Sequence, residues 1–243
     1  MAEYIAIDLP GKILYKKPFS VSIRKITPIE QKYIISLAQK EQDSSRDYLN
    51  FIKKLVTFDN PEMTFEELFW FDLQYILYRI RFVTYSKYPI RLRFKCTNEE
   101  CGEEVKFALN MGDLAIYTPD DIEGLITEIE LEKLGTTEIR NKTVGDDLVI
   151  DNFMAKHGMD KTDLQLRLLL LDLCIVSNGK SLEEMYKLAE EDEITAADIT
   201  AIEEWFTKAV WGVKEEIKIT CPKCGKEESR GYYLTLEDFF SAI

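Results

Sequence analysis

Two short cysteine motifs place the strongest constraint on how this chain can fold. They read Cys96-Thr-Asn-Glu-Glu-Cys101-Gly and Cys221-Pro-Lys-Cys224-Gly, and 119 residues separate them. Each lies between segments in which apolar and polar residues alternate, which is the pattern of β-strands, so we expect each at the tip of a β-hairpin. The alternating apolar residues are Ile90, Leu92, Phe94, Val105, Phe107 and Leu109 around the first motif, and Ile217, Ile219, Tyr232 and Leu234 around the second.

Two thiols a few residues apart at a hairpin tip can supply half of a tetrahedral Cys₄ zinc site. We therefore predict that the two tips meet and that Cys96, Cys101, Cys221 and Cys224 bind one structural Zn²⁺. Free cysteines or two local disulfides are the alternatives. Secreted disulfide scaffolds are cysteine-dense, whereas this chain has five cysteines in 243 residues and begins without the pattern of a signal peptide. The wider spacing of the first motif leaves the ligand geometry there open.

The composition is that of a chain with a substantial core. Hydrophobic residues make up 46% and aromatic residues 12%, which allows one large domain or two modest ones. The longest apolar run, residues 164–176, is interrupted by Arg167 and Asp172 and falls short of the roughly 20 residues of a membrane span. We expect a soluble protein with no membrane contact.

The formal net charge is −13, from 44 acidic and 31 basic side chains. A field of that sign repels phosphate backbones, so we expect no nucleic-acid partner. Arg91, Arg93 and Lys95 form a local basic exception on the first hairpin. Two interpretations of it remain: the solvated face of a strand, or a contact with a polyanion.

Capping residues and apolar periodicity predict an α+β fold. Extended segments are expected within residues 1–26 and at 128–132 and 137–140. Helices are expected over 28–40, 43–58, 64–82, 143–157 and 161–176, then from Ser181 and from Thr195 to about 212.

The two parts of the chain follow one pattern. Ile23-Arg-Lys-Ile-Thr27 resembles Ile139-Arg-Asn-Lys-Thr143, and Met111-Gly-Asp-Leu114 matches Leu236-Glu-Asp-Phe239 at the offset of 125 that also relates Cys96 to Cys221. We predict an internal duplication into related halves, 1–114 and 115–243, that form one compact unit and share the zinc site. Coincidence between ordinary α+β patterns is the alternative.

No set of catalytic residues stands out. The one histidine, His157, is expected at a helix end, where it interacts favourably with the helix dipole. No phosphate-binding glycine loop or Gly-x-Ser-x-Gly motif occurs, and Cys174 lies in an apolar stripe typical of a buried, inert thiol. We predict no enzymatic activity and no small-molecule substrate. The apolar segment 236–243 is expected to dock on the chain's own core or on a neighbour.

Several stretches resemble the baseplate hub and hub-assembly proteins of T-even-like contractile-tailed bacteriophages. They are Leu9-Pro-Gly-Lys12, Ile23–Pro28, Phe71–Tyr85, Thr143–Leu148 and Asn178–Leu182. The resemblance implies a non-enzymatic component or assembly factor of the virion tail baseplate that is made in the host cytoplasm and binds other baseplate and tail proteins. The leading prediction is a structural subunit. The alternatives are a transient assembly chaperone and a zinc-ribbon nucleic-acid adaptor.

Overall fold

The fold mixes helices with small antiparallel sheets, as the sequence predicts. A computed structural model describes residues 3–38, 45–118, 128–176, 179–208, 211–234 and 239–240. Within these residues the chain forms seven α-helices, one three-stranded sheet and four two-stranded sheets. The α+β class is therefore confirmed.

The first part of the chain builds a small sheet covered by helices. Strands β1 (Tyr4–Ile7), β2 (Val21–Arg24) and β3 (Val56–Phe58) pair in that order. Helices α1 (Pro28–Ala38) and α2 (Ser45–Lys53) lie between β2 and β3, and the long helix α3 (Trp70–Thr84) follows. Helix α3 leads directly into the first cysteine hairpin, β4 (Ile90–Lys95) and β5 (Glu104–Leu109).

The second part consists of a strand pair, four helices and a hairpin. Strands β7 (Glu128–Leu131) and β8 (Gly135–Glu138) pair, and four helices follow: α4 (Val144–Lys156), α5 (Leu164–Ile175), α6 (Leu182–Glu190) and α7 (Ala196–Lys208). The chain then reaches the second cysteine hairpin, β10 (Glu216–Thr220) and β11 (Glu227–Gly231). A two-stranded sheet of β6 (Ala115–Tyr117) and β9 (Gly212–Lys214) joins the segments before and after these helices.

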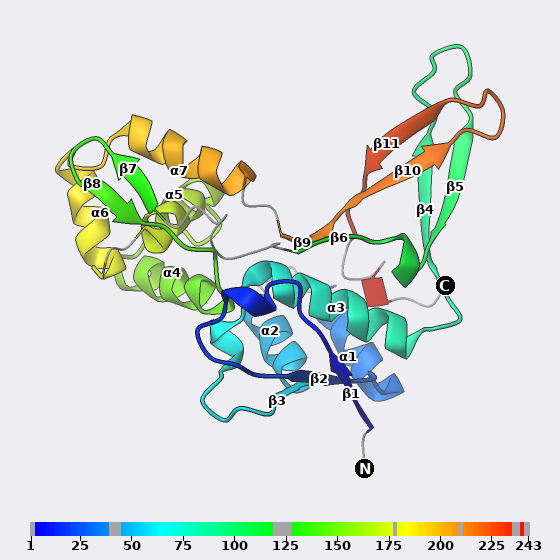
Figure 1. The fold of residues 1–243 in the computed structure, drawn as a ribbon, viewed down its shortest axis with the longest axis horizontal. Coiled ribbons are helices and arrows are strands. Elements are labelled where there is room, and N and C mark those ends of the chain that lie inside the picture. Colours follow the sequence, from blue (N-terminus) through cyan, green and yellow to red (C-terminus); the bar gives the residue numbers. More distant parts are fainter. Residues whose placement is uncertain are drawn as a thin grey trace.

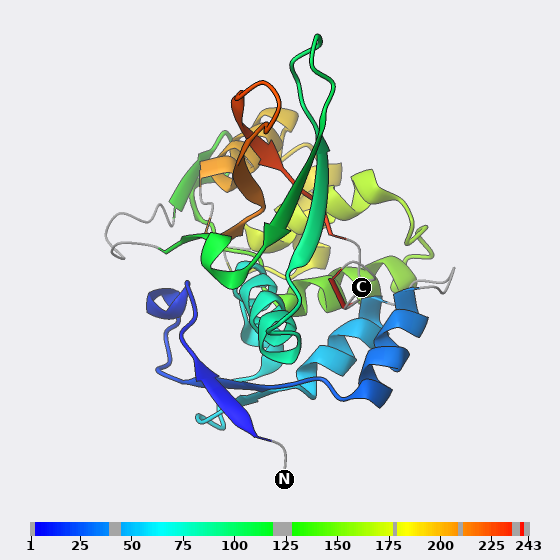
Figure 2. The ribbon, with the colours of Figure 1, turned by 90° about the vertical axis from the view of Figure 1, so that its right-hand side faces the viewer.

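The two cysteine hairpins stand side by side at one end of the molecule, while α4–α7 with β7 and β8 lie at the other end of the long axis (Figure 1). Seen from the side, both hairpins project in the same direction away from α3 (Figure 2). Segments more than a hundred residues apart in sequence are therefore neighbours.

The largest apolar core combines residues from both ends of the chain. It holds side chains of β2, α2 and α3 together with Ile217 and Ile219 of the second hairpin and Phe239 and Phe240 near the C-terminus. Two smaller cores lie among β7, β8 and α4–α7. Of the two docking places expected for the apolar C-terminal segment, the chain's own core holds Phe239 and Phe240, its described residues.

Local capping signals set the helix starts where the sequence predicts them. Thr27 and Glu30 form a capping box before α1, and Thr143 with Asp146 and Ser181 with Glu184 do the same for α4 and α6. His157 is the C-terminal cap of α4, as expected.

The structure corrects several local predictions. Residues 12–14, expected to be extended, form the 3₁₀ helix η1, and residues 56–58, expected to be helical, form β3 because they pair with β2. The capping box Thr64–Glu67 starts only the short 3₁₀ helix η2 (Phe65–Glu67), and α3 starts afresh at Trp70. The pairing of β6 with β9 was not predicted. Residues 119–127 of the expected connection and most of 235–243 lie outside the described residues.

Candidate metal centre

Four cysteine sulfurs meet where the tips of the two hairpins come together. Cys96 and Cys101 from the first hairpin and Cys221 and Cys224 from the second have all their Sγ atoms within 4.8 Å of one another. The Cys96–Cys224 and Cys101–Cys221 sulfur distances are both 3.7 Å, so each hairpin contributes one sulfur to each close pair. The predicted meeting of the four thiols is therefore present in the structure.

A glycine turns the backbone after the second cysteine of each motif. Gly102 has a φ of +57° and Gly225 a φ of +71°, a region that residues with a side chain rarely adopt. The turn of the second motif is closed by hydrogen bonds from Cys221 N to Lys226 O and from Gly225 N to Cys221 O, both 2.9 Å. Together these turns fold both sulfurs of a motif to the same side.

The wider first motif uses Asn98 to accommodate its two additional residues. The Asn98 carbonyl oxygen accepts hydrogen bonds from the N–H groups of Cys101 (2.9 Å) and Gly102 (3.1 Å), and its side chain accepts one from Glu100 N at 3.2 Å. Cys96 N donates to Glu103 O at 2.9 Å, the counterpart of the Cys221–Lys226 bond. The longer spacing thus produces a similar closed turn.

Backbone N–H groups favour the thiolate form at the cluster. Three sulfurs accept a hydrogen bond from the N–H two residues further on: Asn98 to Cys96, Glu103 to Cys101 and Lys226 to Cys224. Each bond lowers the pKa of its thiol, because it stabilises the negative charge. At Cys224 this bond lowers the pKa to about 7, whereas at Cys96 burial and the neighbouring sulfurs outweigh it and raise the pKa to about 12.

The spacing of the sulfurs fits a metal ion better than disulfides. A regular tetrahedron with metal–sulfur bonds of about 2.3 Å has sulfur–sulfur edges of about 3.8 Å, close to the two 3.7 Å separations. A disulfide needs about 2.05 Å. Four thiolates complete a tetrahedral coordination and leave no position for a substrate or a reactive water, so such a site stabilises the fold.

Polar contacts beside the sulfurs also connect the hairpins. The Thr97 hydroxyl bonds to Glu228 and accepts a hydrogen bond from Lys226 Nζ at 2.7 Å. Arg230 Nη2 donates to Lys95 O at 3.0 Å. These bonds fix how one hairpin lies against the other, independently of the metal site.

Cys174 lies far from the cluster, in α5. Its sulfur is buried, donates to Asp146 Oδ1 at 3.4 Å and lies 3.7 Å from Arg140 Nη2. Burial, followed by the negative charge of Asp146, raises the pKa of Cys174 to about 12. The thiol is held in its neutral form, in agreement with the predicted inert role.

Sequence analysis did not single out the buried carboxylates. Asp72 in α3 accepts hydrogen bonds from Gly11 N (2.9 Å) and the Tyr15 hydroxyl (2.7 Å), and burial raises its pKa to about 6. Both its oxygens are therefore engaged in holding the N-terminal loop, which makes Asp72 a structural residue. The one sequence signal for this role is the acid near the start of an apolar helix, which is too common to be distinctive.

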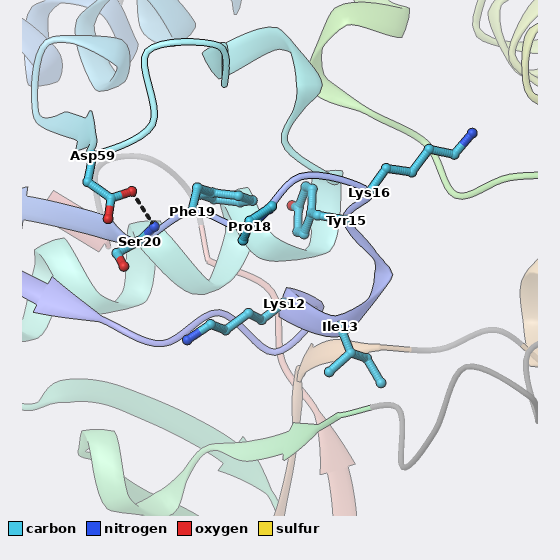
Figure 3. A pocket seen from close by; sticks show the side chains of 8 residues that line it. All are labelled: Lys12, Ile13, Tyr15, Lys16, Pro18, Phe19, Ser20 and Asp59. Atoms are coloured by element: carbon cyan, nitrogen blue, oxygen red, sulfur yellow. Dashed lines mark hydrogen bonds between the residues drawn. The ribbon is translucent and has the colours of Figure 1, made fainter.

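A pocket of about 610 Å³ lies beside the N-terminal loop, lined by residues between Lys12 and Ser20 and by Asp59 (Figure 3). Two of the lining side chains have hydrogen-bond partners in the protein. Asp59 accepts a hydrogen bond of 2.7 Å from Ser20 N, and the Tyr15 hydroxyl donates a hydrogen bond to Asp72. The lining residues that the structure describes include neither histidine nor cysteine. We find no catalytic arrangement in it.

Comparison with known families and proteins gives one informative result. The family described as T4 bacteriophage base plate protein matches residues 1–241. Comparison with curated proteins and with solved structures gave no significant match. No helix within the described part of the chain is long and apolar enough to cross a membrane.

Proposed function

Because the chain belongs to the T4 bacteriophage base plate protein family, we propose that it is a non-enzymatic structural subunit of the hub or inner part of a phage tail baseplate. The family match, which extends over residues 1–241, is the observation that carries this proposal. Its partners would be other baseplate and tail proteins, and its place the tail baseplate of the virion after synthesis in the host cytoplasm.

The metal proposed for the four-cysteine site is zinc. Four thiolate ligands are a usual set for a structural zinc ion, and two of the sulfur–sulfur separations here, both 3.7 Å, are close to the edge of a tetrahedral site, with all four sulfurs within 4.8 Å of one another. Cys96, Cys101, Cys221 and Cys224 would bind the ion, which would fix the two hairpins to each other. A subunit that must present a fixed surface to several neighbours benefits from such a crosslink.

We also propose that residues 1–114 and 115–243 are duplicated halves. Corresponding ion pairs support this: Arg24 binds Glu30 through two hydrogen bonds of 2.9 and 2.7 Å, and Arg140 binds Asp146 through two of 2.7 Å. Arg24 is the last residue of β2 and Arg140 follows β8 by two residues, and each binds an acid in the first turn of the next helix, at an offset of 116 residues.

Buried aspartates give a second correspondence. Asp72 accepts a hydrogen bond from Gly11 N in the loop after β1, and Asp198 accepts one of 2.7 Å from Glu132 N in the loop after β7. The two acids lie near the starts of α3 and α7, at an offset of 126. Failure of residues 19–114 and 137–240 to superpose in a crystal structure would contradict the proposed duplication.

The test of function is purification of the tagged chain from infected cells, with mass spectrometry of what accompanies it, followed by analysis of purified particles. Recovery with other tail proteins in a fixed ratio that persists in the particles supports a structural subunit. Recovery with baseplate precursors but absence from particles supports the assembly chaperone instead. Binding to DNA or RNA that survives moderate salt would support the nucleic-acid adaptor.

A further inference from the structure

The outward face of the first cysteine hairpin is strongly basic. The alternation along β4 and β5 buries Ile90, Leu92, Val105 and Leu109 on one side, and exposes Arg91, Arg93, Lys95 and Lys106 on the other. We call these four exposed residues the basic face. Glu104 is the one acid among the exposed residues of these two strands, so the face carries an excess of three positive charges.

The pairing register places like charges against each other on the basic face. Arg93 lies directly opposite Lys106, an arrangement that destabilises a hairpin. Lys106 reaches Glu104 only at 3.9 Å, and no described residue forms an ion pair with Arg91 or Arg93. Among the described residues, Arg91 and Arg93 therefore have no acidic partner, at some cost to stability.

The second cysteine hairpin provides an internal comparison, because the register of β10 and β11 matches that of β4 and β5. At the offset of 125 residues, the positions of Arg91, Arg93 and Lys95 correspond to Glu216, Lys218 and Thr220. Ser229 stands opposite Lys218, where Lys106 stands opposite Arg93. Neither the hairpin nor the cysteine turn therefore requires a basic outward face.

The negative charge of the chain is concentrated in its second part, away from the basic face. Residues 1–114 carry 17 Lys and Arg against 16 Asp and Glu, whereas residues 115–243 carry 14 against 28. The excess negative charge belongs to the part whose helices lie at the far end of the long axis from the hairpins (Figure 1). Salt at physiological concentration screens electrostatic interactions over about 8 Å, so the distant negative charge has little effect on the basic face.

We propose that the basic face docks against an acidic surface of a neighbouring baseplate protein. This inference rests on the proposed function and names the surface by which the subunit binds. Charge complementarity identifies the occupant: a strand face of six residues, about 20 Å long, that exposes guanidinium and ammonium groups is matched by carboxylates. The family match makes a baseplate protein the expected partner, and binding that nuclease abolishes would identify a nucleic acid instead.

The test reverses one charge on each hairpin, in two separate variants. Arg93→Glu reverses a charge in the middle of the basic face, and Lys218→Glu makes the same change at the corresponding position of the other hairpin. Each variant is supplied to cells infected with phage that lack their own copy, and its amount in purified particles is measured. We expect Arg93→Glu to be reduced about tenfold or more, and Lys218→Glu to match the wild-type chain.

A folding control separates lost docking from lost structure. Arg93→Glu gives Lys106 an opposite charge across the strands, so its melting temperature should equal or exceed that of the wild-type chain. Equal incorporation of both variants would overturn the inference and leave the proposed function intact. Absence of the wild-type chain from particles would instead remove the proposed function and the inference with it.

The chemistry of the occupant is tested by carbodiimide crosslinking of purified particles, which joins lysines to carboxylates in direct contact. Crosslinks from Lys95 or Lys106 to Asp or Glu residues of a different baseplate protein are the expected result. Crosslinks only to a second copy of this chain, or retention of the chain that nuclease abolishes, would overturn the assignment.

Discussion

Single residues at the hairpin tips form the four-cysteine cluster, and the sequence predicts them because the information is local. A cysteine pair and the glycine after it define each turn, and Gly102 and Gly225 take the positive φ angles that such turns need. Local sequence does not show which cysteine of one hairpin lies nearest to which cysteine of the other. The 3.7 Å contacts of Cys96 with Cys224 and Cys101 with Cys221 depend on how the hairpins pack.

Removing one ligand should destabilise the whole chain. Cys224→Ser removes one of the four proposed ligands, so we expect the metal to be lost. Because the site joins distant segments, the free energy of metal binding contributes directly to the free energy of folding. We expect a loss of about 3 kcal/mol or more, against about 1 kcal/mol for Cys174→Ser, whose hydroxyl can still donate to Asp146. Thermal melting measures the difference, and equal melting temperatures for the two variants would contradict it.

Asp172 should make stability depend on pH. It is buried in α5, and burial together with the negative charge of Glu203 raises its pKa to about 7. Because this exceeds the unfolded value of about 4, its contribution to stability is complete below about pH 4 and is lost as the pH rises through 7.

Asp172→Asn should therefore stabilise the chain by about 1–2 kcal/mol at pH 8, and by less at pH 5.5. Urea unfolding at the two pH values measures this, with Glu190→Gln, which removes an exposed acid, as the control. A gain from Asp172→Asn that is the same at both pH values would show that titration of Asp172 is not the cause.

At the scale of elements, the sequence predicts what short-range signals determine. Capping boxes place the starts of α1, α4 and α6, and alternation places the cysteine hairpins. Strands β3, β6 and β9 could not be predicted, because each is only three residues long and is stabilised by pairing with a strand that is distant in the sequence. Helix α3 starts at Trp70, where Trp70 N donates to Lys142 O at 2.9 Å, a contact that no local pattern contains.

The two strand-to-helix ion pairs should differ in importance, because only one acid is deeply buried. The Asp146 side chain is 5% exposed and that of Glu30 26%. Arg140→Ala should cost about 3 kcal/mol, since it leaves a buried carboxylate unpaired, and Arg24→Ala about 1 kcal/mol.

Chemical denaturation of both variants measures this difference. Adding Asp146→Asn to Arg140→Ala should recover part of the loss, because it removes the unpaired charge. Equal losses for Arg140→Ala and Arg24→Ala, with no recovery in the double variant, would contradict the account.

At the scale of the whole molecule, several contacts between described residues join segments that are far apart in the chain. The second hairpin contributes Ile217 and Ile219 to the largest core, β6 pairs with β9, and the segments around Leu68 and Val144 exchange backbone hydrogen bonds of 2.8 and 2.9 Å. A metal bound by the four-cysteine cluster would add a crosslink between the tips of the hairpins. Such long-range contacts cannot be read from the sequence, although the paired cysteine motifs indicate that one must exist.

The central claim, that a shared zinc ion joins the two hairpins, is tested most directly by the metal content of the chain purified without added metal. Elemental analysis should find one zinc per chain, with the four hairpin thiols protected from alkylation until a chelator removes the metal. Cys224→Ser, purified in the same way, should have lost most of the zinc. A folded wild-type chain with no zinc and four readily alkylated hairpin thiols would contradict the account.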